Sequence, residues 1–190
     1  MNEQEFDRML TKYADVVVKV GLNLRKGQKL SIRAIIEDAP FVRKVAESAY
    51  KAGAKYVDVL WNDERISRIR FEHADPETLG EVPNWLLSRY EDHYQNGEAE
   101  LAVYSTDPDL LAGIDPELIA KERTARAKKF EPLRKYENVS NWCVVATASP
   151  AWARKVFPRL STEDAQAKLW EAIFNSCRVD LPDPVQAWYD

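Results

Sequence analysis

Residues 30–61 read LSIRAIIEDAPFVRKVAESAYKAGAKYVDVLW, and this stretch decides the fold. Leu30, Ile32 and Ala34 alternate with polar residues, which predicts a strand. Asp38 and Pro40 then open a helix that ends near Gly53. The β-branched and aromatic run at 56–61 predicts a second strand. Strand, helix and strand together span roughly 35 residues, the size of a right-handed βαβ unit.

The same alternation continues on both sides of this unit. An apolar stripe over residues 6–20 predicts an N-terminal helix that stops at Gly21, whereas residues 62–71 are ambiguous. Strands are expected at 100–105 and 142–148, and helices at 84–96, at 115–136 and after Pro150 and Ser161. Ser161 with Asp164 resembles a capping box. The sequence predicts an α/β fold, an open, mostly parallel sheet of about four strands with helices on both faces in a Rossmann-like three-layer arrangement.

Composition narrows the classes of protein and of partner. The chain has 190 residues, a net charge of −4 and 31% charged residues, which is typical of a globular domain and disfavours nucleic-acid binding. No apolar run approaches the roughly 20 residues that cross a membrane, and the N-terminus lacks signal-peptide features. Two cysteines, Cys143 and Cys177, are too few for a disulfide framework, so we expect a cytoplasmic protein without a membrane partner.

Residues able to carry catalysis are scarce. His73 and His93 match no metal-ligand spacing, and we interpret each as a lone surface histidine. Cys143 falls in a strand that its continuous apolar run predicts to be buried. Residues 34–40, AIIEDAP, contain no glycine, and Glu37 with Asp38 would repel a phosphate. We therefore predict no catalytic residue, no metal ligand and no dinucleotide site in this chain.

Some residues remain as candidates for a cavity wall or an interface. Trp61 and Asp63 follow the second predicted strand, where ligands of open α/β sheets bind, although turn formation is the simpler role for Asp63. Trp85, Trp152 and Trp188 flank turns or helix starts, where an indole ring can serve contact with another domain or subunit.

The C-terminal sequence is unusual for a domain end. DLPDPVQAWYD, residues 180–190, contains a fresh helix start at Asp183 and Pro184. We predict one α/β domain over residues 1–180 and the start of a linker helix over 181–190, leading to a further domain. The alternative is a natural C-terminal helix that docks on the sheet.

Four stretches, in order, resemble the thermophilic aminopeptidases, which include aminopeptidases T and S. They are YADVVVKVGLNLRKGQKLSI, AYKAGAKYVDVLWND, SPAWARKVFP and LWEAIFNSCRVDLPDPVQAW. The resemblance implies a two-domain enzyme, usually dimeric, that removes N-terminal amino acids from peptides with two divalent metal ions, such as cobalt or zinc.

The same resemblance implies that the metal ligands are glutamates, histidines, a tyrosine and an aspartate of the C-terminal half. No position of this chain matches them. We therefore expect the chain to be the N-terminal, non-catalytic domain of such an enzyme, inactive alone and partnered by the catalytic domain. The alternative is a stand-alone α/β module that binds a small ligand or a partner at the carboxyl edge of its sheet.

Overall fold

The computed structural model describes residues 1–136 and 139–189, and the chain divides into two compact units. Unit 1 comprises Met1–Asn62, Ala99–Pro108 and Asn141–Asp190, and unit 2 comprises Asp63–Glu98 and Asp109–Ser140. Both units lie largely within the predicted N-terminal domain, and each is built from more than one segment of the sequence.

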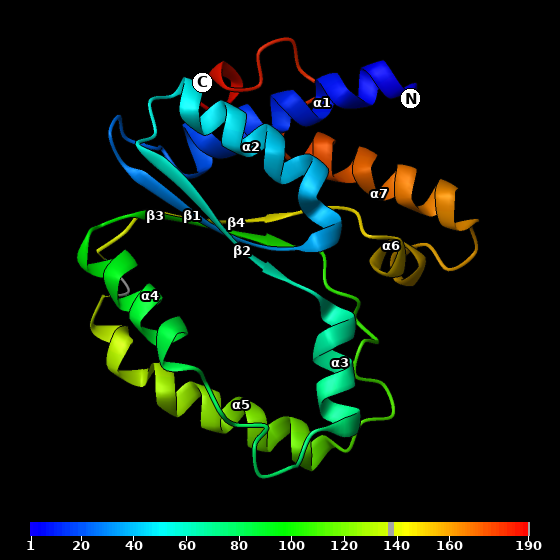
Figure 1. Cartoon of the computed structure of the whole chain (residues 1–190). Coiled ribbons are helices and arrows are strands. Elements are labelled where there is room, and N and C mark those ends of the chain that lie inside the picture. Colours follow the sequence, from blue (N-terminus) through cyan, green and yellow to red (C-terminus); the bar gives the residue numbers. More distant parts are fainter. Residues whose placement is uncertain (137–138, 190) are drawn as a thin grey trace. The chain divides into compact units, whose positions relative to one another are not determined.

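Unit 1 contains a sheet of four parallel strands, as Figure 1 shows. The strands are β1 (Lys29–Ile35), β2 (Tyr56–Asn62), β3 (Ala99–Tyr104) and β4 (Trp142–Ala146), in the order β2-β1-β3-β4. Each predicted strand is confirmed to within two residues. The predicted α/β fold with an open parallel sheet is also confirmed.

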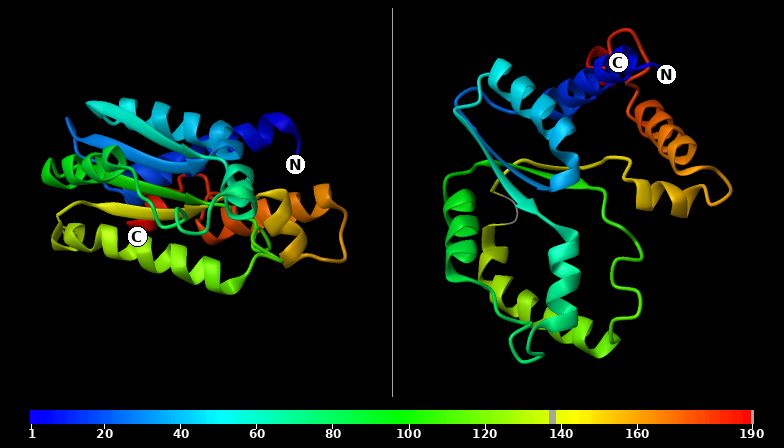
Figure 2. Two further views of the ribbon diagram at one scale, coloured as in Figure 1. Left: turned by 60° about the horizontal axis from the view of Figure 1, so that its bottom comes forward. Right: turned by 45° about the vertical axis from the view of Figure 1, so that its right-hand side comes forward.

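Helices α1 (Glu3–Val16), α2 (Ala39–Lys51) and α7 (Thr162–Ser176) lie on the same face of this sheet (Figures 1 and 2). A shorter helix, α6 (Pro150–Val156), precedes α7. Leu30, Ile32 and Leu101 are fully buried beneath these helices, together with Val45 of α2. The Ser161 hydroxyl accepts a hydrogen bond from the Asp164 N–H (3.1 Å), which confirms Ser161 as the cap of α7.

The N-terminal helix ends differently from the sequence prediction. Its α-helical part stops at Val16, and Val17–Gly21 form a π-helical turn. A Cβ atom at Gly21 would lie 2.8 Å from the Sγ atom of Cys143 on β4. The absence of a side chain at Gly21 therefore allows the end of this helix to approach β4 closely.

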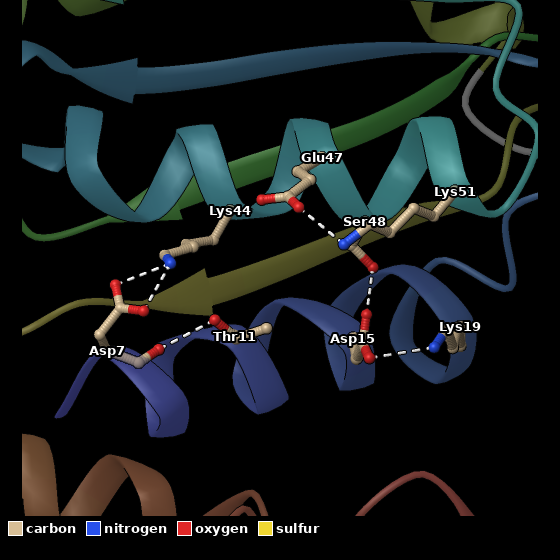
Figure 3. A network of polar contacts seen from close by, with 8 residues as sticks. All are labelled: Asp7, Thr11, Asp15, Lys19, Lys44, Glu47, Ser48 and Lys51. Atoms are coloured by element: carbon tan, nitrogen blue, oxygen red, sulfur yellow. Dashed lines mark hydrogen bonds and ion pairs between the residues drawn. The ribbon is translucent and has the colours of Figure 1, made fainter. Parts of the chain in front are cut away.

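Polar contacts join α1 to α2 along their exposed sides (Figure 3). The Lys44 ammonium group lies 2.7 Å from the Asp7 carboxylate, and the buried Ser48 hydroxyl donates to Asp15 over 2.5 Å. These contacts bridge the two helices, whereas the Glu47–Lys51 ion pair stays within α2. The α1–α2 interface thus has an apolar inner side and a polar outer side.

Strand β4 corrects the expectation of a strand buried on both sides. It is an edge strand, and its Trp142 and Val144 side chains are 64% and 57% exposed. Cys143, expected to be buried, is half-buried. Since adjacent side chains of a strand point to opposite faces, α1 and α7 cover only alternate residues of β4. The continuous apolar run of β4 is therefore not explained by burial among the described residues.

Unit 2 consists of α3 (Glu64–His73), α4 (Asn84–Gln95), α5 (Pro116–Phe130) and a 3₁₀ helix, Glu131–Tyr136. The ambiguous stretch after β2 is thus helical. The helix expected over 115–136 changes to 3₁₀ geometry because Pro132 has no N–H for an α-helical hydrogen bond. Neither α3 nor α5 contains a buried residue. Aromatic contacts hold α4 and the end of α5 together, through Tyr90, Tyr94, Phe130 and Tyr136.

The C-terminal segment of unit 1 contains a 3₁₀ helix, Gln186–Trp188, where the sequence suggested the start of a longer helix. The Asp183 carboxylate accepts a hydrogen bond from the Gln186 N–H (3.0 Å), so Asp183 caps this turn.

Across the described residues, the structure contains no helix with the length and apolar character needed to span a membrane.

Candidate functional site

The carboxyl ends of β1 and β3 lie side by side at the centre of the sheet. From β1 the chain continues to β2 on one side of this pair, and from β3 it continues to β4 on the other side. Such a reversal is a topological switch point, where open α/β sheets bind their ligands.

Three buried polar residues meet at these strand ends. Asp38 follows β1, Ser105 follows β3 and Thr147 follows β4. The Ser105 hydroxyl donates to Oδ2 of Asp38 over 2.8 Å, and the Thr147 hydroxyl donates to Oδ1. Their exposed fractions are 6%, 1% and 3%, respectively. The hydrogen bonds of this cluster link the segments that follow β1, β3 and β4, and its three side chains are closed to solvent.

Burial raises the pKa of the Asp38 carboxyl above its ordinary value, although its hydrogen bonds from Thr147 and Ser105 act in the opposite direction. Desolvation disfavours the charged form of the acid, and donated hydrogen bonds favour it. The cluster therefore holds a carboxyl group whose proton is bound more firmly in the folded chain than in the unfolded one.

Sequence reasoning missed this role of Asp38. The residue occupies the N-cap position of α2, as the helix signal predicted, but its side chain makes no capping hydrogen bond. Its carboxylate points instead to two hydroxyls contributed by later strands. The available signal was that a short polar residue follows each of three strands; spacing along the chain did not show that they meet.

Exposed apolar side chains lie at the same edge of the sheet. Ile36, Trp61 and Tyr104, each at or just beyond the end of a strand, are 47%, 42% and 57% exposed. Trp152 of α6 packs edge-to-face against Tyr104, with ring centroids 6.3 Å apart. The carboxyl ends of the strands thus carry exposed apolar side chains in addition to the buried polar cluster.

Of the other candidate residues, Asp63 directly follows β2, whereas Trp85 and Trp188 lie away from the strand ends. Asp63 caps α3 by accepting a hydrogen bond from the Arg65 N–H (2.9 Å), the simpler role considered for it. Trp85 stands 61% exposed in the first turn of α4. Trp188 lies in the C-terminal 3₁₀ helix, where its indole N–H donates to the Cys177 carbonyl (3.0 Å).

The two histidines have different environments. His73 is exposed, whereas His93 is 4% exposed and lies with its Nδ1 3.2 Å from the Glu98 carboxylate. The interpretation of His93 as a surface histidine is therefore wrong, since the chain turns at Gly97 and returns Glu98 to it. Within residues 1–136 and 139–189, no group of three or more His, Cys, Asp or Glu side chains is placed to hold a metal ion.

Comparison with known proteins places the chain among the metalloproteases. The chain belongs to the thermophilic metalloprotease (M29) family, whose model matches residues 6–190. The resemblance to thermophilic aminopeptidases is thus confirmed.

The relatives of the chain are aminopeptidases by name, and they are longer. The chain is 41% identical to Aminopeptidase 2 of Geobacillus stearothermophilus and 42% identical to Aminopeptidase T of Thermus thermophilus. Each alignment covers 96% of this chain but 45% of the relative. The solved structure of wild-type AmpT from Thermus thermophilus superimposes with a TM-score of 0.88, at 40% identity, over 97% of this chain and 45% of that one. The chain therefore spans about half the length of these relatives.

Proposed function

We propose that this chain is the N-terminal, non-catalytic region of a cytoplasmic two-metal aminopeptidase that removes N-terminal amino acids from peptides. The observation that carries the proposal is the family match over residues 6–190, combined with relatives of which the chain covers 45%. The remaining half of the enzyme would supply the catalytic domain, and two such enzymes would form a homodimer.

Within residues 1–136 and 139–189, the donor groups do not fit a two-metal centre. Such a centre needs several converging oxygen and nitrogen ligands with room for a water molecule. His93 is engaged by Glu98, and His73 is exposed on α3. The cobalt, zinc or similar ions of the complete enzyme would therefore be held by residues outside this chain. The role of this chain would be to wall the substrate cavity.

The candidate residues have a place in this proposal. Trp61 and Trp152 lie at the carboxyl edge of the sheet, and Trp85 is largely exposed on α4. Exposed indole rings bury a large apolar area when a partner covers them. We propose that these rings, with Asp63 and Trp188, face the peptide cavity or the catalytic domain.

The reading frame that contains the chain gives the first test. We expect it to continue with a segment rich in His, Glu and Asp, and a frame that ends at residue 190 would contradict the proposal and favour a stand-alone binding module. The protein from the complete frame should release a chromophore from an amino-acid anilide with added cobalt, zinc or manganese. The 190-residue chain should not, and a chelator should abolish the activity of the longer protein. Chelator-sensitive turnover by the 190-residue chain itself would also contradict the proposal.

A further inference from the structure

An apolar groove of about 510 Å³ runs in unit 1 between the end of α1, strand β4 and helix α7. The Tyr13 hydroxyl, one of the few polar groups in its lining, already donates to the Ala146 carbonyl (3.0 Å). The volume far exceeds the roughly 30 Å³ of a water molecule. An apolar occupant suits this groove, whose walls include Val16, Val20, Cys143, Val145, Ile173 and Cys177.

The groove extends to the open edge of β4. Four consecutive residues, Cys143 to Ala146, line it. Side chains alternate between the faces of a strand, so a lining of four consecutive residues includes the backbone or the edge of β4 as well as the side chains of one face. Among the described residues, no strand pairs with the outer side of β4.

In the part of the chain that the structure describes, this edge lacks the charges and prolines that protect open edges. Natural edge strands carry charges, prolines or bulges, or are covered by another segment, because their free backbone groups invite pairing. Strand β4 reads WCVVA, with neither a charge nor a proline, and its Trp142 and Val144 are exposed. The composition of β4 is therefore that of a strand covered in its working state.

The last described residues are attached beside the groove. Trp188 lines the groove, and the Arg178 guanidinium group lies 5.1 Å from the centre of its ring. The Tyr189 hydroxyl donates to the Lys19 carbonyl over 3.2 Å. A polypeptide that continues from this segment would start next to β4.

We propose that an extended apolar segment of the remaining half of the enzyme lies along the open edge of β4 and inserts its side chains into the groove. The inference rests on the proposed function, because it takes the occupant from the part of the longer relatives that this chain does not match. A polypeptide supplies backbone hydrogen bonds to the edge and apolar side chains to the groove, as in β-augmentation. A small apolar molecule supplies only the second.

The two groove cysteines provide the test. Burial raises the pKa of both thiols, so labelling with an uncharged maleimide is measured at one mildly alkaline pH for every sample. We expect Cys143 and Cys177 to react about tenfold more slowly, or slower still, in the protein from the complete reading frame than in the 190-residue chain. Equal rates would overturn the inference, and aminopeptidase activity of the longer protein would then still support the proposed function.

A matched pair of variants on α7 tests whether occupancy of the groove is what slows labelling of the two cysteines. Ala172 is exposed and lines the groove, whereas Ala167 is exposed on the same helix and does not. Ala172→Glu should leave the melting temperature of the 190-residue chain unchanged but restore fast labelling in the longer protein. Ala167→Glu should leave the melting temperature unchanged and the labelling of the longer protein slow, and equal labelling of the two variants would contradict the inference.

Two other occupants would be recognised in the same samples. Concentration-dependent dimerisation of the 190-residue chain that Ala172→Glu abolishes would assign the groove to a second copy. An apolar small molecule found by mass spectrometry in the purified longer protein, with labelling that becomes fast on its extraction, would assign it to a ligand. Either result would overturn the docking of an enzyme segment.

Discussion

The two units of the chain are held together in different ways. In unit 1, fully buried side chains from strands and helices form one apolar core. In unit 2, α3 and α5 contribute no buried residue. A few buried side chains such as Leu79 and Leu86, aromatic contacts, and arginines that bond to backbone carbonyls make its contacts. A core buries its groups against many neighbours, whereas each arginine acts through a few hydrogen bonds. We therefore expect single substitutions to have larger effects in unit 1.

The largest difference should come from leucine truncation. Leu101→Ala in β3 removes a fully buried side chain and should lower the free energy of unfolding by about 2–5 kcal/mol. Leu118→Ala in α5 removes a half-buried side chain and should cost about 1 kcal/mol. Urea denaturation of both variants measures the difference, and equal losses would remove the contrast between the units.

The second effect concerns an arginine of unit 2. The Arg68 guanidinium group donates to the Leu110 and Ala112 carbonyls over 2.6 and 3.2 Å and pairs with Glu72. Arg68→Ala should destabilise unit 2 by about 1–2 kcal/mol, since the side chain is partly exposed. Arg65→Ala, at an exposed position one turn earlier, should stay within about 0.5 kcal/mol. Hydrogen exchange of the α3 amides separates the two variants; faster exchange in both would show that α3 responds to any lost charge.

The third effect is a pH dependence located in unit 1. Because the pKa of Asp38 is raised on folding, the protonated acid favours the folded state. Its contribution is complete below the unfolded pKa near 3.8 and is lost as pH rises through the folded pKa. The stability of the native chain relative to Asp38→Asn should therefore fall as pH increases from about 4.

A second variant checks the assignment to Asp38. Ser105→Ala removes a hydrogen bond that favours the charged carboxylate, so the fall in stability should extend to higher pH. Denaturation curves at several pH values measure it. A pH profile of Asp38→Asn that parallels that of the native chain would exclude Asp38 as the titrating group.

The smallest effects lie on the polar side of the α1–α2 interface in unit 1 (Figure 3). Ser48→Ala removes a buried hydroxyl bonded to the Asp15 carboxylate and should cost about 1 kcal/mol. Lys51→Ala breaks an exposed ion pair within one helix, so we expect no measurable change in melting temperature. If Lys51→Ala proved as costly as Ser48→Ala, exposed charges would matter to unit 1 as much as buried groups.

The sequence by itself determined the elements and their order. Alternation located β1, a β-branched and aromatic run located β2, and the capping signal at Ser161 located the start of α7. These features depend on backbone and side-chain interactions within a few residues, so their patterns can be read along the chain. Four motifs in order also indicated the family, which the match over residues 6–190 confirms.

Only the tertiary structure decided which side chains meet and which are buried. Thr147 bonds to Asp38 across 109 residues of sequence, and β4 is a partly exposed edge strand although its apolar run predicted a buried one. His93 is buried although nothing in its local pattern distinguishes it from His73. Burial and long-range hydrogen bonds depend on how the elements pack, and the same local patterns are compatible with several packings. The cluster at the sheet edge and the groove beside β4 therefore became visible only in the folded chain.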